Sequence, residues 1–142
     1  MTPNTLAGAK RRSPRGTETA TVRAILQYLH LRGYLAWRQN SRVVMLPGRG
    51  GKPAPYRMGG VKGMADVIGV QPWCAAVGVH APGNPGHGCD PKYHVSRFFA
   101  IEVKSATGKP TPEQTQFLAA VIRAGGIAFL ARSVKDVQDH GL

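Results

Sequence analysis

Two stretches of the chain carry apolar residues at helical spacing, and both predict long helices. The first covers residues 17–32, where an apolar stripe recurs every three or four positions and Gly33 supplies the stop. The second covers residues 111–124, where Thr111 is expected as the N-cap and Gln114 as its capping-box partner. Each helix therefore has one face suited to burial against a core.

Short apolar runs between and after these helices are typical of strands. A short helix capped by Ser133 is expected near the end of the chain, and residues 47–63 are expected to form a mobile, glycine-rich, basic loop. Residues 71–97 are expected to form an irregular insertion. The order of elements predicts one α/β domain over residues 17–142, with a mixed sheet flanked by helices. The expected strands are residues 35–39 and 42–46, joined at Asn40-Ser41, then 64–70, 98–104 and 127–131.

The strand at residues 98–104 is apolar except near its end, where Glu102 and Lys104 interrupt it. Side chains alternate between the two faces of a strand, so these two charges project together while Ile101 and Val103 pack behind them. Burying charges is costly unless they pair or hold a metal. The strand is therefore either an edge strand with a surface salt bridge or part of an active site.

Charge along the chain is strongly unbalanced. Of 142 residues, 19 are Lys or Arg and 7 are Asp or Glu, which gives a net charge of +12. Such an excess favours a partner that carries phosphates. Residues 1–16 are expected to form a disordered basic arm. No stretch has the length and apolarity of a membrane span or a signal peptide, so the interpretation is a cytoplasmic protein that faces nucleic acid.

Acids are scarce, which makes their positions informative. Asp66 is a lone carboxylate in the apolar run 64–70, and on a neighbouring strand it would meet Glu102. Two carboxylates supply the oxygen ligands that Mg²⁺ prefers, and Lys104 could stabilise developing negative charge. Glu18, near the start of the first helix, either completes the metal site or only complements the helix dipole.

In this order, Asp66, Glu102-Val103-Lys104 and Gln114, preceded by Glu18 in a helix, resemble the PD-(D/E)xK nuclease pattern. Further details are similar to its VRR-NUC (virus-type replication-repair nuclease) branch, in the small stand-alone form. These details are the runs at residues 61–69, 101–104 and 109–114, with Gly125-Gly126 before the last strand. The resemblance covers about residues 17–138 and implies a restriction-endonuclease-like αβββαβ core.

The resemblance also implies an activity and the residues that carry it. The family consists of divalent-metal-dependent DNA nucleases, so Asp66, Glu102 and the Val103 carbonyl would bind Mg²⁺ or Mn²⁺, with Glu18 nearby. Lys104 would be the catalytic lysine, and Gln114 would lie near the DNA or the attacking water. Small members are similar to Holliday-junction resolvases, which implies a homodimer, branched or flapped DNA, a role in DNA repair and a bacterial or phage source. The expected DNA contacts are Arg42, Lys52, Arg57 and Lys62.

Two departures from the family and two alternatives remain open. Ala65 stands where the family has its naming proline, and the insertion at residues 71–97 separates Asp66 from Glu102 unusually widely. That insertion contains a set of residues that could bind zinc, although without the usual spacings. A non-catalytic DNA- or RNA-binding module would share the same basic composition. The possible zinc ligands are Cys74, His80, His87, Cys89 and His94.

Overall fold

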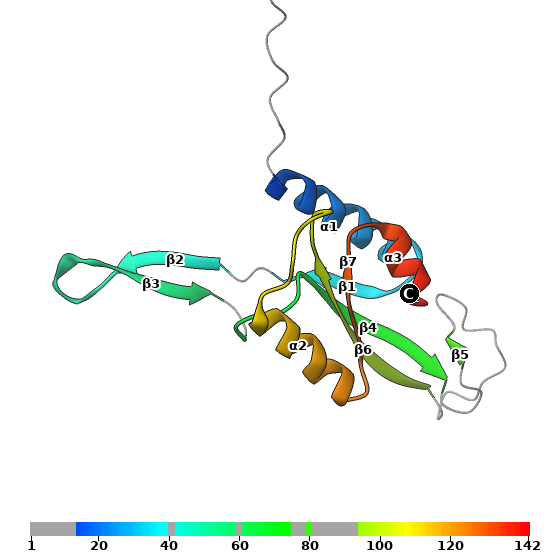
Figure 1. Cartoon of the computed structure of the whole chain (residues 1–142). Helices are drawn as coiled ribbons and strands as arrows, with labels where there is room; N and C mark the ends of the chain where they lie inside the picture. Colours follow the sequence, from blue (N-terminus) through cyan, green and yellow to red (C-terminus); the bar gives the residue numbers. More distant parts are fainter. Residues whose placement is uncertain (1–13, 40–41, 59–60, 75–78, 81–93) are drawn as a thin grey trace, which may run out of the picture.

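A computed structural model describes residues 14–39, 42–58, 61–74, 79–80 and 94–142 of the chain (Figure 1). The predicted α/β class with a mixed sheet is confirmed. The helices are α1 (Pro14–Leu31), α2 (Pro112–Arg123) and α3 (Val134–Asp139), with a short 3₁₀ turn, η1 (Arg49–Gly51). The strands are β1 (Leu35–Arg38), β2 (Arg42–Pro47), β3 (Pro53–Met58), β4 (Val67–Cys74), β5 (Val79–His80), β6 (His94–Val103) and β7 (Ile127–Ala131).

The main sheet has the strand order β1-β4-β6-β7, with β5 pairing along β4. β4 is antiparallel to both β1 and β6, whereas β7 is parallel to β6. The connection between the parallel strands passes through α2, as parallel pairing requires. β6 is thus a central strand, held by hydrogen bonds on both sides.

Alternating side chains of β6 divide the core into two layers. Phe99, Ile101 and Val103 are buried with α1 and α3 on one face of the sheet. Ala100 is buried on the other face with Val121 of α2. Figure 1 shows the same arrangement, with α1 and α3 over one face and α2 over the opposite one. Packing on both faces fixes the position of β6, and it therefore also fixes the side chains at the end of this strand.

Helix α1 begins earlier than the sequence predicts. It starts at Pro14 rather than Thr17, so residues 14–16 belong to the helix and not to the predicted basic arm; residues 1–13 lie outside the described part. Proline is favoured at the first helical position because its missing N–H has no intrahelical partner there. The predicted stop is confirmed, since Gly33 adopts φ 78° directly after the helix. The shift moves Glu18 out of the first turn.

The first two predicted strands are present, but they do not pair with each other. β1 pairs with β4, and β2 pairs instead with β3 in a separate two-stranded sheet. Residues 53–58, expected within a loop, form β3, because Tyr56 and its neighbours extend opposite the apolar run of β2. Glycines at the tip allow the chain to reverse: Gly50 and Gly51 both have positive φ. The result is a hairpin that projects away from the main sheet (Figure 1).

Strand boundaries around the predicted insertion are also corrected. β4 begins at Val67 rather than at residue 64 and continues to Cys74, while β6 already begins at His94. Both ends of the expected irregular region are therefore strand, because the β4–β6 ladder extends to the pair Cys74↔His94. Residues 75–78 and 81–93 lie outside the described part. The second helix, its capping box and the last strand and helix are confirmed.

Gly69 allows β1 to approach β4 closely, and we expect Gly69→Ala to destabilise the fold. A methyl group at this position would overlap the carbonyl oxygen of Leu35 and the ring of the buried Phe99. Because backbone and core ring cannot shift freely, the cost should be about 3 kcal/mol in chemical denaturation. Gly50→Ala is the control, since it meets nothing within 4 Å and strains only its positive φ. Equal, small effects of both substitutions would contradict this packing.

Candidate active site

Three of the predicted site residues meet at one end of the main sheet. Asp66 lies directly before β4, Glu102 is near the end of β6, and Lys104 follows that strand. The antiparallel register pairs Val67, the first residue of β4, with Ile101 of β6. Asp66 precedes Val67 and Glu102 follows Ile101, so this register brings Asp66 next to Glu102. The backbone N–H of Lys104 donates to Ala131 O at 3.0 Å, which continues the ladder with β7 past the strand end.

Glu102 is the most constrained of these residues. Its side chain is 1% exposed, and its Oε1 pairs with the Lys104 Nζ at 2.7 Å. The same oxygen accepts a hydrogen bond from the Gln114 Nε2 of α2. The other oxygen, Oε2, is buried and has no hydrogen-bond partner among the residues that the structure describes. A buried carboxylate oxygen without a partner is costly, so it calls for an explanation in terms of a ligand or a proton.

The pKa of Glu102 is raised to about 7 from 4.5. Burial is the largest cause, and the charge of the neighbouring Asp66 carboxylate adds to it; the hydrogen bond from Lys104 acts in the opposite direction. Two carboxylates side by side in a mostly buried position repel each other, and one way to relieve this is a shared proton. The other way is a cation between them.

Asp66 and Glu18 both accept hydrogen bonds from the backbone around the end of β6. The Oδ2 of Asp66 accepts from the Val103 N–H at 2.9 Å. The Oε1 of Glu18 accepts from the Ser105 N–H, also at 2.9 Å. The alternative that Glu18 only complements a helix dipole is wrong, because Glu18 lies beyond the first turn and contacts the loop after β6. Together the two acids hold the backbone on either side of Lys104.

Gln114 performs two tasks at once. Its Oε1 accepts from the Thr111 N–H at 2.8 Å, which is half of the capping box of α2. Its Nε2 meanwhile donates to Glu102. The start of α2 is therefore tied to the end of β6 through a single side chain. The predicted place of Gln114 near the DNA or the attacking water stays a prediction.

A pocket of about 290 Å³ opens at this cluster and is lined by Glu18, Thr19, Val22, Arg38, Asp66 and Lys104. Arg38 is the residue that the sequence analysis missed. Its position follows from strand alternation: Ala36 is buried against α1, and Arg38, two residues later, faces the same side. The described residues give Arg38 no ion-pair partner. It is thus a cation available to a ligand in the pocket.

Whether these residues suit a divalent cation can be judged from the two carboxylates. No group of three or more His, Cys, Asp and Glu side chains placed to hold a metal occurs among the described residues. Asp66 and Glu102 nevertheless lie together, with a buried oxygen that lacks a partner. Mg²⁺ is often bound by only one or two carboxylates, because it keeps several waters and takes further oxygens from substrate phosphates. The pair fits such an ion.

The predicted DNA contacts have separate surroundings. Lys62 forms an ion pair with Glu113 at the start of α2, and this holds the pKa of Glu113 down at about 2. Lys52 is exposed at the tip of the β2–β3 hairpin. Arg42 and Arg57 lie at the base of the hairpin, in β2 and β3, and their side chains are outside the described part. The same holds for all five possible zinc ligands, so that prediction stays open.

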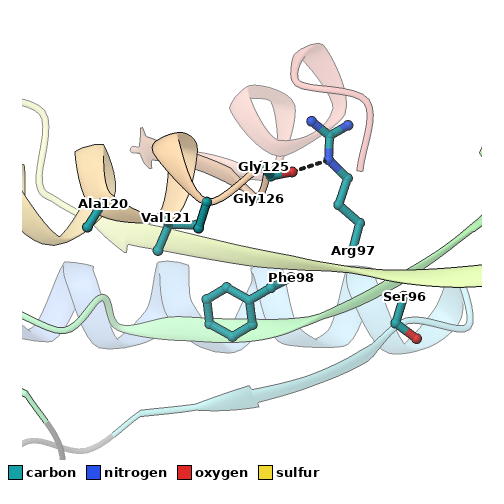
Figure 2. A pocket seen from close by; sticks show the side chains of 8 residues that line it. Ser96, Arg97, Phe98, Ala120, Val121, Gly125 and Gly126 are labelled. Carbon is teal, nitrogen blue, oxygen red and sulfur yellow. Dashed lines mark hydrogen bonds between the residues drawn. The ribbon is translucent and has the colours of Figure 1, made fainter.

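A larger pocket, of about 520 Å³, lies between β6 and the end of α2 (Figure 2). Phe98 and Val121 line it, and the Nε of Arg97 donates to Gly125 O at 2.9 Å across its rim. No carboxylate of the described part of the chain lines this pocket. Size alone would favour it as a binding site, but Glu102, whose pKa is raised by burial, lies with Asp66 and Lys104 at the other end of β6.

Comparisons with protein-family models, with curated proteins and with solved structures find no match to this chain. The function must therefore be argued from the site itself. No helix in the described part of the chain has the length and apolarity needed to cross a membrane.

Proposed function

We propose that this protein is a divalent-metal-dependent endonuclease that hydrolyses phosphodiester bonds in DNA, with the restriction-endonuclease-like core of the PD-(D/E)xK superfamily. The observation that carries the proposal is the pair formed by Asp66 and the buried Glu102, with Lys104 in contact. The chain has a net charge of +12 and few acids, so two acids that lie together despite their mutual repulsion indicate a functional role. A metal site beside a phosphate-binding surface would be such a role.

Asp66 and Glu102 are the residues that would hold the metal, in the proposal together with the Val103 carbonyl. Bound Mg²⁺ or Mn²⁺ supplies a Lewis acid that neutralises negative charge on the phosphodiester and makes water a usable nucleophile. Glu18 is assigned a supporting role, because its carboxylate already accepts the Ser105 N–H. It can still reach the pocket, which it lines together with Asp66.

The remaining side chains act on the substrate and on the carboxylates. The Lys104 ammonium lies at the carboxylate pair and lines the pocket, so it can orient the attacking water and stabilise the charge that develops on the phosphate. Gln114 fixes Glu102 through its amide. Arg38, which lines the same pocket, is placed to contact a phosphate oxygen of the bound strand.

Branched or flapped DNA is the proposed substrate, and a homodimer the proposed form. A dimer would carry two such pockets related by a two-fold axis, which suits symmetrical cutting of a four-way junction. Excess positive charge supports the affinity for DNA of any shape, so charge does not select among these substrates.

The test incubates the protein with labelled four-way junction, 5′ flap, single-stranded and plain duplex DNA, each with Mg²⁺, Mn²⁺ or EDTA. We expect paired nicks in the junction or a cut at the flap, both abolished by EDTA and restored by added metal. Binding without cleavage in either metal would overturn the proposal and favour a non-catalytic DNA-binding module.

A further inference from the structure

The β2–β3 hairpin pairs with no other strand of the described fold. Its strands form a sheet of their own, separate from the main sheet, and the six register pairs from Arg42↔Met58 to Pro47↔Pro53 join them only to each other. Met45, Leu46 and Tyr56 are 60%, 46% and 57% exposed, so neither face is covered. Figure 1 shows the hairpin standing clear of the sheet and helices. An ordered but uncovered element of this kind is suited to an external partner.

The hairpin is rooted at the pocket. The chain enters it just after Arg38, which lines the pocket, and the next residue, Gln39, donates its N–H to Asp66 O at 2.8 Å. It returns through residues 61–66, which end at Asp66 itself. Gly63 permits this return, because it has φ 80° and leaves no room for a side chain beside the backbone of Glu113. The two ends of the hairpin are therefore fixed on either side of the proposed metal ligand.

Charge identifies the kind of partner. No acid occurs between Glu18 and Asp66, a stretch that contains eight Lys and Arg residues, four of them within the hairpin: Arg42, Arg49, Lys52 and Arg57. A protein partner that extends the hairpin by strand addition is disfavoured, since Pro53 and Pro55 provide no N–H donors along β3. A polyanion is the complementary surface.

The dimensions of the hairpin indicate that the polyanion is duplex DNA. Each strand of six residues spans roughly 20 Å, which matches about six base pairs along a B-form duplex. The major groove of B-DNA, about 12 Å wide, admits a two-stranded ribbon, whereas the deep and narrow major groove of A-form RNA does not. We infer that the β2–β3 hairpin is an arm that binds the groove of duplex DNA next to the phosphodiester held in the pocket. Its placement beside a cleaved bond rests on the proposed function.

Two variants and one control test the arm. One variant replaces residues 42–58 with a short Gly-Ser linker, which the independent pairing of β1 with β4 should tolerate. The other keeps the hairpin and removes its charges, as Arg42→Ala/Lys52→Ala/Arg57→Ala. The control, Arg32→Ala/Arg123→Ala/Lys135→Ala, removes the same charge from exposed positions in α2 and α3 and directly after α1.

Binding is measured in EDTA, so that it does not depend on cleavage, on a long DNA duplex, on the RNA duplex of the same sequence and on a DNA duplex too short to reach the arm. Both arm variants should bind the long DNA at least tenfold more weakly. The slope of log Kd against log salt should fall by about 2 to 3 in the charge variant and by about 3 to 4 in the deletion, which removes four positive charges. The control and the short duplex should show little change. Wild-type protein should prefer the DNA duplex to the RNA duplex.

Each other result has a definite meaning. Unchanged affinity in both arm variants, or equal binding of DNA and RNA duplexes, would overturn the inference. The inference would also be overturned if the arm deletion converted a dimer into a monomer while the charge variant kept its affinity for DNA. The arm would then be a contact between two copies of the chain. Arm-dependent binding without metal-dependent cleavage would instead refute the nuclease and leave the arm as a DNA-binding element.

Discussion

Lys104→Ala is expected to reduce DNA cleavage by about 100-fold or more, while DNA affinity stays within a few-fold of the wild type. The side chain of Lys104 is only 16% exposed and its ammonium is held 2.7 Å from the carboxylate of Glu102. In the proposed function it would therefore act at the reacting centre rather than on the outer surface. Single-turnover cleavage with Mg²⁺ measures the first effect, and binding in EDTA measures the second.

Lys135→Ala is the matched control for this substitution. Lys135 also pairs with an acid, Asp139, at 2.7 Å, but it is 76% exposed on α3. Both variants lose one positive charge, so a loss of cleavage in both would point to long-range electrostatics rather than to chemistry at one site. Wild-type cleavage by Lys104→Ala would show that the assigned site is wrong. Thermal unfolding of both variants separates a catalytic effect from a loss of folded protein.

The sequence predicts the elements of the core well, because each has a local signature. The helix over residues 112–123 has both a cap and a breaker, and its capping box forms as expected around Thr111 and Gln114. The hairpin was missed because its pairing depends on tertiary context. Glycine and proline at its tip are typical of a loop, and nothing local indicates that β1 would pair with the more distant β4 rather than with its neighbour β2.

Some residues of the candidate site could be predicted from the sequence, and others could not. Acids within apolar runs pointed to Asp66 and Glu102, since a buried charge is unusual enough to be noticed in a sequence. Arg38 was missed because a cation at a strand end is ordinary in so basic a chain. Only the fold shows that its face of β1 meets α1 at the pocket. The hydrogen bond of Glu18 to Ser105, eighty-seven residues away, is likewise a product of tertiary packing.

Glu102→Gln is expected to make the metal-free protein more stable at pH 8 and about equally stable at pH 4. The pKa of Glu102 is about 7 in the folded protein against 4.5 as its ordinary value. Because the folded state binds this proton more tightly, the contribution to stability is complete below pH 4.5 and is lost as the pH rises through 7. At about 1.4 kcal/mol per pH unit, the loss is on the order of 3 kcal/mol. The amide variant has no such proton to lose and would escape this penalty.

Added Mg²⁺ should make the wild type more stable than Glu102→Gln at pH 8, the reverse of the order expected without metal. In the wild type, Mg²⁺ would bind the ionised carboxylate, release its proton and raise the free energy of unfolding, increasingly so from pH 6 to pH 8. The amide variant should gain little from Mg²⁺ and should not cleave DNA, and Asp66→Asn should likewise weaken both metal binding and cleavage. Denaturant unfolding with Mg²⁺ or EDTA at several pH values measures these effects.

Glu113→Gln is the control for the pH dependence of Glu102→Gln. The pKa of Glu113 is about 2 against an ordinary value of 4.5, so this exposed acid is ionised in both the folded and the unfolded chain from pH 6 to pH 8. Its replacement should therefore shift stability equally at pH 6 and pH 8, a range over which the effect of Glu102→Gln changes. If Glu102→Gln were instead less stable than wild type at every pH, with or without Mg²⁺, Glu102 would serve as the structural partner of Lys104. A carboxylate that weakens the metal-free fold and strengthens the metal-bound one is retained for its ligand, because packing alone would favour the amide.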